Sequence, residues 1–317
     1  MRHVSRSGAL GVIAAGAGAA LLARPVWAQT APVKLRVGSV PADTYAGGFY
    51  ALDLGLFDKA GLSVEIFPFT NGAAMAAAAA GGSIDAGVGD AIELANGISR
   101  GLPFAVIAGG GLYSTNAPTT TLCIAKSSPV VRAADLEGQN IAVVSIVSLS
   151  SVAVKSWLTQ NGADITKVRF VEMPFPQMPS ALARGAIAGA CLSEPIMSDA
   201  TAADAKVFGK VYDAIAKLFL ISDWFTTRDW LAKNPDVAKR FVGAVYDAAR
   251  WANAHHDDSA AILAKYSKVD VDRIKRMNRC TYATDLQPAM IQPVLDTAFK
   301  YKALATATSA ASMIVKV

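Results

Sequence analysis

The sequence predicts an α/β fold of two similar lobes, each a mostly parallel β-sheet flanked by helices. The main observation is an internal repeat. Residues 79–90 and 182–195 both run from an Ala-rich helical segment through a Gly turn into a short apolar strand, and each strand ends at a carboxylate, Asp90 or Glu194. Ligands of open α/β sheets bind beyond the carboxyl ends of the strands. Two such units therefore predict two lobes whose strand ends face a shared cleft.

The N-terminus has the pattern of a cleavable secretory signal. Arg2 and Arg6 precede an apolar run at 10–22 that is short for a bilayer span, and Val26-Trp27-Ala28 offers small or modest residues where a signal peptidase reads. We expect cleavage after Ala28 and export to the periplasm. The mature chain then has about 289 residues, which suits two lobes, and a formal charge of about +2 instead of +5. This small charge does not favour a nucleic-acid partner.

The first half of the mature chain alternates strands with helices. The strand at 33–40 alternates apolar Leu35 and Val37 with Lys34 and Arg36. The expected order is strand 33–40, helix 45–56, strand 62–69, helix 75–80, strand 86–89, helix 91–100 and strand 104–108. A βα series of this kind predicts a parallel sheet. The polar stretch 114–120 then interrupts the series.

A second series follows that stretch. Its expected elements are strands 121–126, 140–145, 168–173 and 189–193, with helices 148–161 and 177–184, and then two short strands at 207–212 and 218–222. Asn234-Pro235-Asp236 favours the start of a long helix, with Asn as N-cap and Pro at the first helical position. We expect this helix to run to about Ala254, and two more helices near 270–277 and 288–304.

Six segments carry a family resemblance: 50–57, 60–65, 82–89, 134–143, 173–179 and 193–195. In their order and spacing they resemble the periplasmic solute-binding proteins of ABC importers, in the branch named for aliphatic sulfonates, taurine, nitrate and thiamine-precursor pyrimidines. The resemblance implies a type II-like two-lobed fold that closes over its ligand at a hinge. Lobe one would hold 33–117 and 229–317, and lobe two 118–228, with crossings at 114–120 and near 223–227. It also implies a monomer without cofactor or metal, which works with a membrane permease and its cytoplasmic ATPase.

The best candidate for a ligand site is the start of the helix that follows the strand 140–145. Ser145, Ser148, Ser150 and Ser151 surround it, and the first N–H groups of a helix have no partner within the helix. Such a helix start binds anions. No Arg or Lys lies between Gln139 and Val154, so the site would depend on backbone and hydroxyl groups. The alternative is an ordinary Ser N-cap with solvated neighbours.

Other candidates lie at strand ends and crossings. They are Asp43, Thr44 and Tyr45 after the first strand, Asn71 after the second, Ser114 at the first crossing, Asp90 and Glu194 at the ends of the repeats, Phe175 between two prolines, and Trp224 near the second crossing. The two carboxylates could bind a cationic amine, accept hydrogen bonds beside an anion pocket, or serve the hinge. Asn71 could equally be a turn residue, and the aromatic residues could be pocket walls or ordinary core.

Metal and enzyme chemistry receive little support from the residues. His255 and His256 are adjacent, so on a helix they point about 100° apart and cannot both meet one ion. They are also the two histidines left after signal removal, and no Gly-x-Ser-x-Gly motif occurs. Cys123 and Cys191 lie in apolar strand patterns typical of buried thiols. We therefore expect a binding protein, not an enzyme, that captures a small anionic organic solute of sulfonate or carboxylate type. A thiamine-precursor pyrimidine, a sensor subunit for a membrane receptor, or a pyrimidine-synthase enzyme on the same fold are the alternatives.

Overall fold

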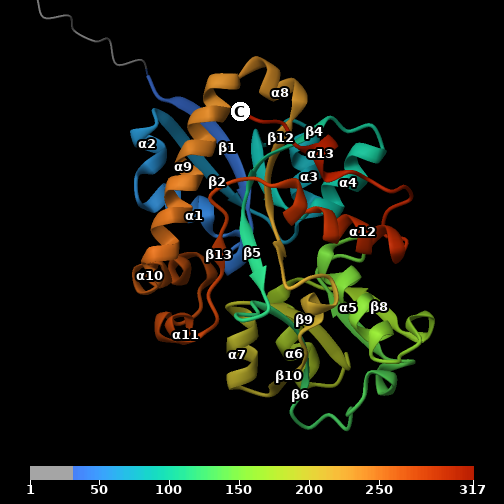
Figure 1. Cartoon of the computed structure of the whole chain (residues 1–317). Coiled ribbons are helices and arrows are strands. Elements are labelled where there is room, and N and C mark those ends of the chain that lie inside the picture. Colours follow the sequence, from blue (N-terminus) through green and yellow to red (C-terminus); the bar gives the residue numbers. More distant parts are fainter. Residues whose placement is uncertain (1–30) are drawn as a thin grey trace, which may run out of the picture. The chain divides into compact units, whose positions relative to one another are not determined.

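The computed structural model describes residues 31–317, of which residues 32–317 form one compact unit (Figure 1). The predicted signal segment therefore lies outside the described residues. Within the described part, no helix has both the length and the apolar character needed to cross a membrane. The unit is built on two five-stranded sheets and a small three-stranded sheet.

The first sheet has the strand order β2-β1-β3-β12-β4. Its strands are β1 Val33–Ser39, β2 Leu62–Pro68, β3 Ala86–Gly89, β4 Phe104–Gly109 and β12 Asp223–Thr227. β1 pairs in parallel with β2 and β3, whereas β12 is antiparallel to both of its neighbours. The sequence predicted the four strands of the first βα series, and β12 joins them from a distant part of the chain.

The second sheet repeats this layout in the order β10-β6-β9-β7-β8. Its strands are β6 Thr120–Ala125, β7 Asn140–Val143, β8 Arg169–Glu172, β9 Gly189–Ser193 and β10 Ala205–Gly209. β7 is parallel to β8 and β9, and β6 is the antiparallel strand. β3 and β9 thus occupy the same position in the two sheets, between a parallel neighbour and the antiparallel strand, as the repeat predicts. The expected α/β class with two lobes is confirmed.

Two antiparallel strands connect the sheets. β5 Gly111–Ser114 leads from the first sheet to the second, β11 Leu218–Leu220 leads back, and β5 also pairs with β13 Thr281–Tyr282 (Figure 1). The segment 223–227, expected as the second crossing and as part of lobe two, forms β12 in the first sheet instead. Its Trp224 and Phe225 face apolar layers on the two sides of that sheet, which explains why it belongs there. The remaining lobe boundaries stay a proposal.

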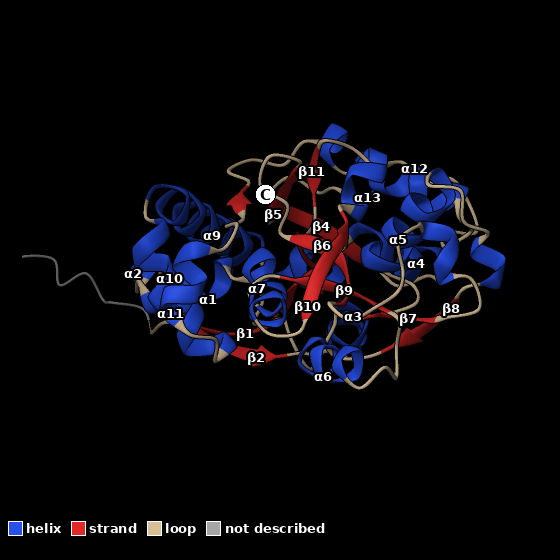
Figure 2. Ribbon diagram, turned by 90° about the horizontal axis from the view of Figure 1, so that it is seen from below, coloured by secondary structure: helices blue, strands red, loops and turns tan. Residues whose placement is uncertain are grey.

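Helices flank both sheets (Figure 2). They are α1 Gly47–Asp53, α2 Leu56–Lys59, α3 Gly72–Ala80, α4 Ala91–Ser99, α5 Leu149–Gln160, α6 Met178–Ala183, α7 Ile196–Ala202, α8 Arg228–Lys233, α9 Pro235–Ala254, α10 His256–Ser267, α11 Val271–Arg276, α12 Gln292–Lys300 and α13 Ala310–Met313. α9 has the predicted bounds. His255 and His256 are exposed where α9 ends, and α10, a helix that the sequence did not predict, begins directly after it.

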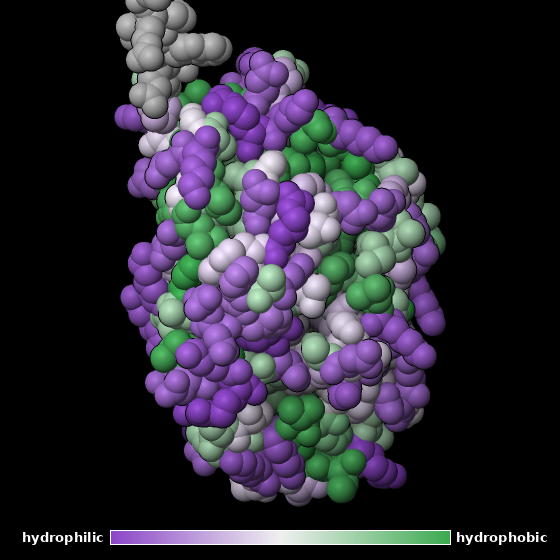
Figure 3. All heavy atoms as spheres, turned by 60° about the vertical axis from the view of Figure 1, so that its left-hand side comes forward, coloured by the Kyte–Doolittle hydropathy of each residue, from purple (hydrophilic) through white to green (hydrophobic). Residues whose placement is uncertain are grey.

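In the core of the first lobe, helices α1 and α9 pack closely against Trp224 of strand β12. Trp224 is 2% exposed and packs edge-on against Phe241 of α9. A Cβ atom at Gly48 of α1 would lie 2.9 Å from the Trp224 ring, so glycine lets the helix approach it. Trp224 is therefore a core residue. On the face shown in Figure 3, apolar side chains form several areas separated by hydrophilic ones.

Candidate functional site

Two adjoining cavities lie where the carboxyl ends of the two sheets face each other. The inner cavity measures about 10 Å³, close to the space that one water needs. It is lined by Tyr45, Asp90, Val144, Leu149, Ser150, Phe175, Ser193, Tyr212 and Ile221. Four of these residues, namely Tyr45, Asp90, Ser150 and Phe175, are among the predicted site residues. A solute larger than water therefore needs the lobes or side chains to move.

The outer cavity is larger and mostly apolar. Its volume is about 270 Å³, and it is lined by Val40, Pro41, Ala42, Pro68, Phe69, Thr70, Pro174, Phe175, Pro176, Ser193, Ile196 and Ser267. Phe175 and Ser193 line both cavities, so they mark the boundary between them. The arrangement offers a polar inner end and an apolar outer space, which can hold a small organic molecule with a polar group at one end.

Asp90 joins the two lobes. It is the N-cap of α4, where its Oδ1 accepts hydrogen bonds from Ile92 N (2.9 Å) and Glu93 N (3.0 Å). Its Oδ2 accepts a third hydrogen bond, of 2.9 Å, from the N–H of Leu149, the first residue of α5 in the other lobe. Burial raises the pKa of Asp90 to about 6, although these N–H groups act to lower it.

Three of the serines that the sequence suggests for an anion site at the start of α5, Ser145, Ser148 and Ser150, are hydrogen-bonded to one another. Ser148 is the N-cap residue, yet its hydroxyl does not cap the helix; it donates to Ser145 O (2.7 Å) and lies 2.9 Å from Ser150 Oγ. The Ser145 hydroxyl accepts from Val147 N at 3.3 Å. Among the four serines, Ser150 alone lines the inner cavity, while Ser145 and Ser148 shape the loop behind it.

Asp43 and Thr44 support the first lobe. The Asp43 carboxylate is fully buried, forms a 3.1 Å ion pair with Arg279, and accepts from Cys280 N at 2.6 Å. The backbone oxygen of Thr44 accepts from Ser222 Oγ at 2.7 Å. Neither side chain lines the two cavities. Both are held by the fold, next to Tyr45, which does reach the inner cavity.

Three other predicted residues have local partners outside the cavities. The Glu194 carboxylate accepts from the backbone N–H (3.0 Å) and hydroxyl (2.8 Å) of Ser198 in α7, and burial raises the pKa of Glu194 to about 7. Asn71 is the N-cap of α3, accepting from Ala74 N at 2.8 Å. Ser114 lies in β5, where its hydroxyl accepts from Asn116 N at 3.3 Å. These local hydrogen bonds account for the polar side chains of the three residues, and no ligand is needed to explain them.

Sequence reasoning missed Ser193 and Tyr212. Ser193 ends β9, so the strand-end argument that selected Glu194 could have selected it. Tyr212 lies in the short helix η5, Val211–Ala214, a segment that was predicted to be a strand. No local pattern marks it, because it reaches the cavity only through the tertiary fold. Burial raises the pKa of both Tyr45 and Tyr212 well above the ordinary value, so both remain neutral hydroxyls.

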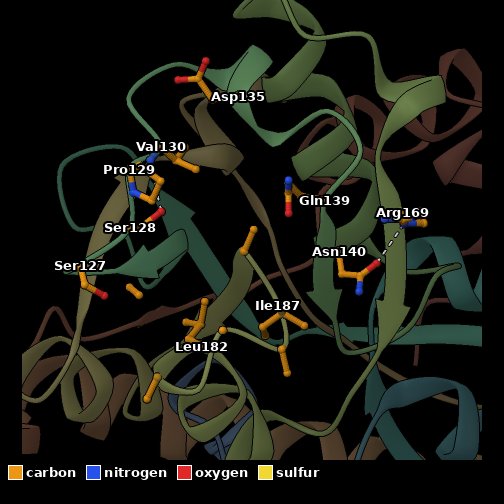
Figure 4. A pocket seen from close by; sticks show the side chains of 15 residues that line it. Ser127, Ser128, Pro129, Val130, Asp135, Gln139, Asn140, Arg169, Leu182 and Ile187 are labelled. Carbon is orange, nitrogen blue, oxygen red and sulfur yellow. Dashed lines mark hydrogen bonds between the residues drawn. The ribbon is translucent and has the colours of Figure 1, made fainter.

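A larger cavity of about 620 Å³ lies at the opposite edge of the second sheet (Figure 4). Asn140 and Arg169, the first residues of β7 and β8, lie in its wall and share a 3.2 Å hydrogen bond. The cavity is therefore at the amino ends of these strands, whereas α/β folds bind ligands at the carboxyl ends. We therefore do not assign the ligand site to this cavity, although it is larger than the two cavities between the lobes.

The described residues show no group of His, Cys, Asp and Glu side chains arranged to hold a metal ion. His255 Nδ1 lies 2.8 Å from the Trp251 carbonyl oxygen on the same helix face. The cysteines at 123, 191 and 280 are all buried and free, as predicted for the first two. Burial raises the pKa of Cys123 to about 11, so its reactive thiolate is scarce at neutral pH.

The sequence profile of the NMT1-like family matches residues 28–267 of the chain. None of the curated proteins matches the chain in sequence.

Several solved structures have a similar fold. The alkanesulfonate-binding protein SsuA from Xanthomonas axonopodis pv. citri bound to MOPS has a TM-score of 0.77 at 18% identity, covering 90% of this chain and 99% of that one. The periplasmic nitrate-binding protein NrtA from Synechocystis PCC 6803 has a TM-score of 0.75 at 16% identity, covering 90% and 86%. The desulfurization enzyme DSZB has a TM-score of 0.65 at 15% identity, covering 90% and 96%. The described residues thus have the two-lobed fold of periplasmic binding proteins.

Proposed function

The chain belongs to the NMT1-like family, and from this membership and the geometry of the cleft we propose that it is the solute-binding subunit of an ABC importer. In this proposal it captures one small organic solute between its lobes and delivers it to a membrane permease that works with a cytoplasmic ATPase. The observation that carries the proposal is the pair of adjoining cavities between the carboxyl ends of the two sheets.

We take the solute to be an anion with an apolar body. Leu149 and Ser150 at the start of α5 line the inner cavity, and a helix start favours negative charge. The outer cavity, with Phe69 and Phe175 in its wall, suits an organic body better than bare nitrate. Solved relatives of similar fold are named for alkanesulfonate and for nitrate binding, which supports an anion.

Binding without turnover is part of the proposal. The fold also occurs in the desulfurization enzyme DSZB, so the fold alone does not decide the question. The inner cavity is lined by two tyrosines, two serines and one carboxylate, and in the described chain it contains no His or Cys that could act as base or nucleophile. We place the protein in the periplasm, with cleavage after Ala28, as the sequence predicts.

A thermal-shift screen of the purified protein against small sulfonates, carboxylates, amines and pyrimidines tests the function. A ligand at 100 times its Kd adds roughly 2.7 kcal/mol to the free energy of unfolding, so a true ligand raises the Tm clearly. Calorimetry of each hit should give one ligand per chain, and the recovered ligand should be chemically unchanged. A modified product, or a library without any stabilising solute, would contradict the proposal.

A further inference from the structure

A single carboxylate lies at the start of two helices that belong to different lobes. Asp90 follows β3 of the first sheet and caps α4, while its second oxygen accepts the N–H of Leu149 at the start of α5, which follows β7 of the second sheet. Asp90 is 3% exposed. The N–H group that the sequence offers to an anion is therefore bonded to a carboxylate of the chain itself.

Two serine hydroxyls at the start of α5, those of Ser148 and Ser151, do not cap the helix. The Ser148 hydroxyl bonds to the Ser145 carbonyl oxygen instead of capping the helix. The Ser151 hydroxyl is fully buried and has no partner among the described residues. Buried hydroxyls without partners are uncommon, since leaving one unpaired costs free energy. Of the four serines, Ser150 is the one whose side chain lines the inner cavity and can contact an anionic group there.

The groups around Asp90 are acids, not bases. Besides burial, the charge of Asp90 raises the pKa of Tyr45 in η1 (Asp43–Tyr45), of Glu93 in α4, of Tyr212 in η5 and of Asp223 in β12. Glu172 of β8 also raises the pKa of Glu93. No Lys, Arg or His lines either cleft cavity in the part of the chain that the structure describes. An ionised Asp90 would thus repel an anion at α5 with no basic side chain to compensate.

We propose that the Asp90 carboxylate occupies the position at the start of α5 where the anionic group of the ligand binds. An anionic solute then binds by displacing this carboxylate from the helix start. This inference rests on the proposed function and adds the regulation of its site. When the lobes are closed without ligand, the Asp90 carboxylate would bridge them, and in the complex the ligand would do so. Asp90 then selects against anions whenever it carries its charge.

The proposal couples anion binding to a proton. A neutral Asp90 still accepts from Ile92 and Glu93 through one oxygen, but it no longer repels the ligand. Burial raises the pKa of Asp90 to about 6, and burial raises the pKa of Glu93 and Asp223 well above their ordinary range. Protonated Asp90 is abundant below pH 6 and scarce above it, so affinity for an anion falls as pH rises through about 6.

The test measures Kd by calorimetry between pH 5 and pH 8, with benzenesulfonate as anionic probe and benzylammonium as a cation with the same ring. Two variants remove the charge and keep a good N-cap for α4: Asp90→Asn and Asp90→Ser. Asp164→Asn, at an N-cap that accepts from Thr166 N outside the cavities, is the matched control. Nitrate, butanesulfonate and benzoate complete the panel of anions.

We expect wild-type protein to bind benzenesulfonate about ten- to a hundredfold more weakly at pH 8 than at pH 5, because the fraction of neutral Asp90 limits binding. Both Asp90 variants should bind it at pH 8 as tightly as wild type does at pH 5, and Asp164→Asn should behave as wild type. Equal pH dependence in wild type and both Asp90 variants would overturn the proposal, as would weaker anion binding in the variants.

The same experiment separates this inference from the proposed function. If benzylammonium binds to wild type, more tightly at higher pH and only with Asp90 intact, the protein still captures solutes, but the role given to Asp90 is wrong. If no anion of the panel binds wild type or either variant at any pH, the Asp90 proposal is also wrong. The solute-binding function itself fails only if the wider screen yields no ligand.

Discussion

At the scale of single residues, Asp43 shows how a polar group at a strand end can serve the fold. Its position after β1 predicts a ligand contact, but its carboxylate is buried with Arg279, which is itself 8% exposed. Arg279 also donates to Tyr50 Oη at 3.0 Å and to Ser259 Oγ at 3.0 Å. The pair thus ties the segment after β1 to the C-terminal part of the chain.

Replacing Arg279 should therefore destabilise the protein strongly. Arg279→Met leaves the Asp43 carboxylate buried without its counter-charge, which costs about 3–5 kcal/mol of unfolding free energy. Lys265→Met is the matched control, because Lys265 pairs with Asp53 at the surface at 2.9 Å, where an ion pair contributes about 1 kcal/mol or less. Urea denaturation measures both. A loss in Arg279→Met no larger than in Lys265→Met would show that the buried pair is not important.

At the scale of elements, the two repeats place a carboxylate before the helix that follows the strand, but only Asp90 is an N-cap residue, since the N-cap of α7 is Pro195. Asp90 follows β3 and Glu194 follows β9, and each accepts N–H groups from the first turn of the helix after its strand. Asp90 also reaches α5, whereas Glu194 bonds to Ser198 with both of its oxygens. The repeated sequence thus builds one local structure twice, and one copy faces the inner cavity.

The start of α5 is where a change of element structure should alter binding. Ser150→Ala removes the hydroxyl that lines the inner cavity, and a lost hydrogen bond to a charged ligand costs roughly 1.5–3 kcal/mol, or about ten- to a hundredfold in Kd. Ser180→Ala changes a serine in the first turn of α6, outside the cavities, and should bind as wild type. Calorimetry with an anion found in the screen measures both, and the Tm of ligand-free Ser150→Ala should change little. Normal binding by Ser150→Ala would refute the assignment of the site.

At the scale of the whole molecule, the lobes contact each other across the cleft. Besides the bond from Leu149 to Asp90, Asp43 N donates to Glu194 O at 3.0 Å, and Arg273 of α11 forms an ion pair with Asp199 of α7. β5 and β11 connect the lobes as a pair of antiparallel strands. We expect these two adjacent connections to act as the hinge about which one lobe rotates against the other.

Ligand should therefore change the distance between the lobes. We expect small-angle scattering to give a smaller radius of gyration with a saturating ligand than without it. The ligand-free protein must sample a more open form to admit a solute larger than water, and a bound solute holds the lobes together. A solute that does not raise the Tm in the screen serves as control. An unchanged radius of gyration with a confirmed ligand would contradict closure.

The sequence by itself determined the class of the fold and its repeated plan. Strand and helix periodicity is local, so β1 to β4 and α9 could be predicted from short windows. The repeat marked β3 and β9 as equivalent strands and directed attention to Asp90 at a strand end. The same local patterns did not predict α10, and they assigned 223–227 to a crossing. A short window of sequence shows neither that a second helix follows α9 directly nor that β12 inserts between β3 and β4.

Only the tertiary structure decided which polar residues face the cleft. Asp43, Asn71 and Glu194 follow strands just as Asp90 does, but their oxygens bond to Arg279, Ala74 and Ser198 within their own lobe. Tyr212 lines the inner cavity although nothing in its neighbourhood marks it. The physical reason is that a strand-end position is set by local sequence, whereas the partner of its side chain is set by which distant segments the fold brings within hydrogen-bond distance.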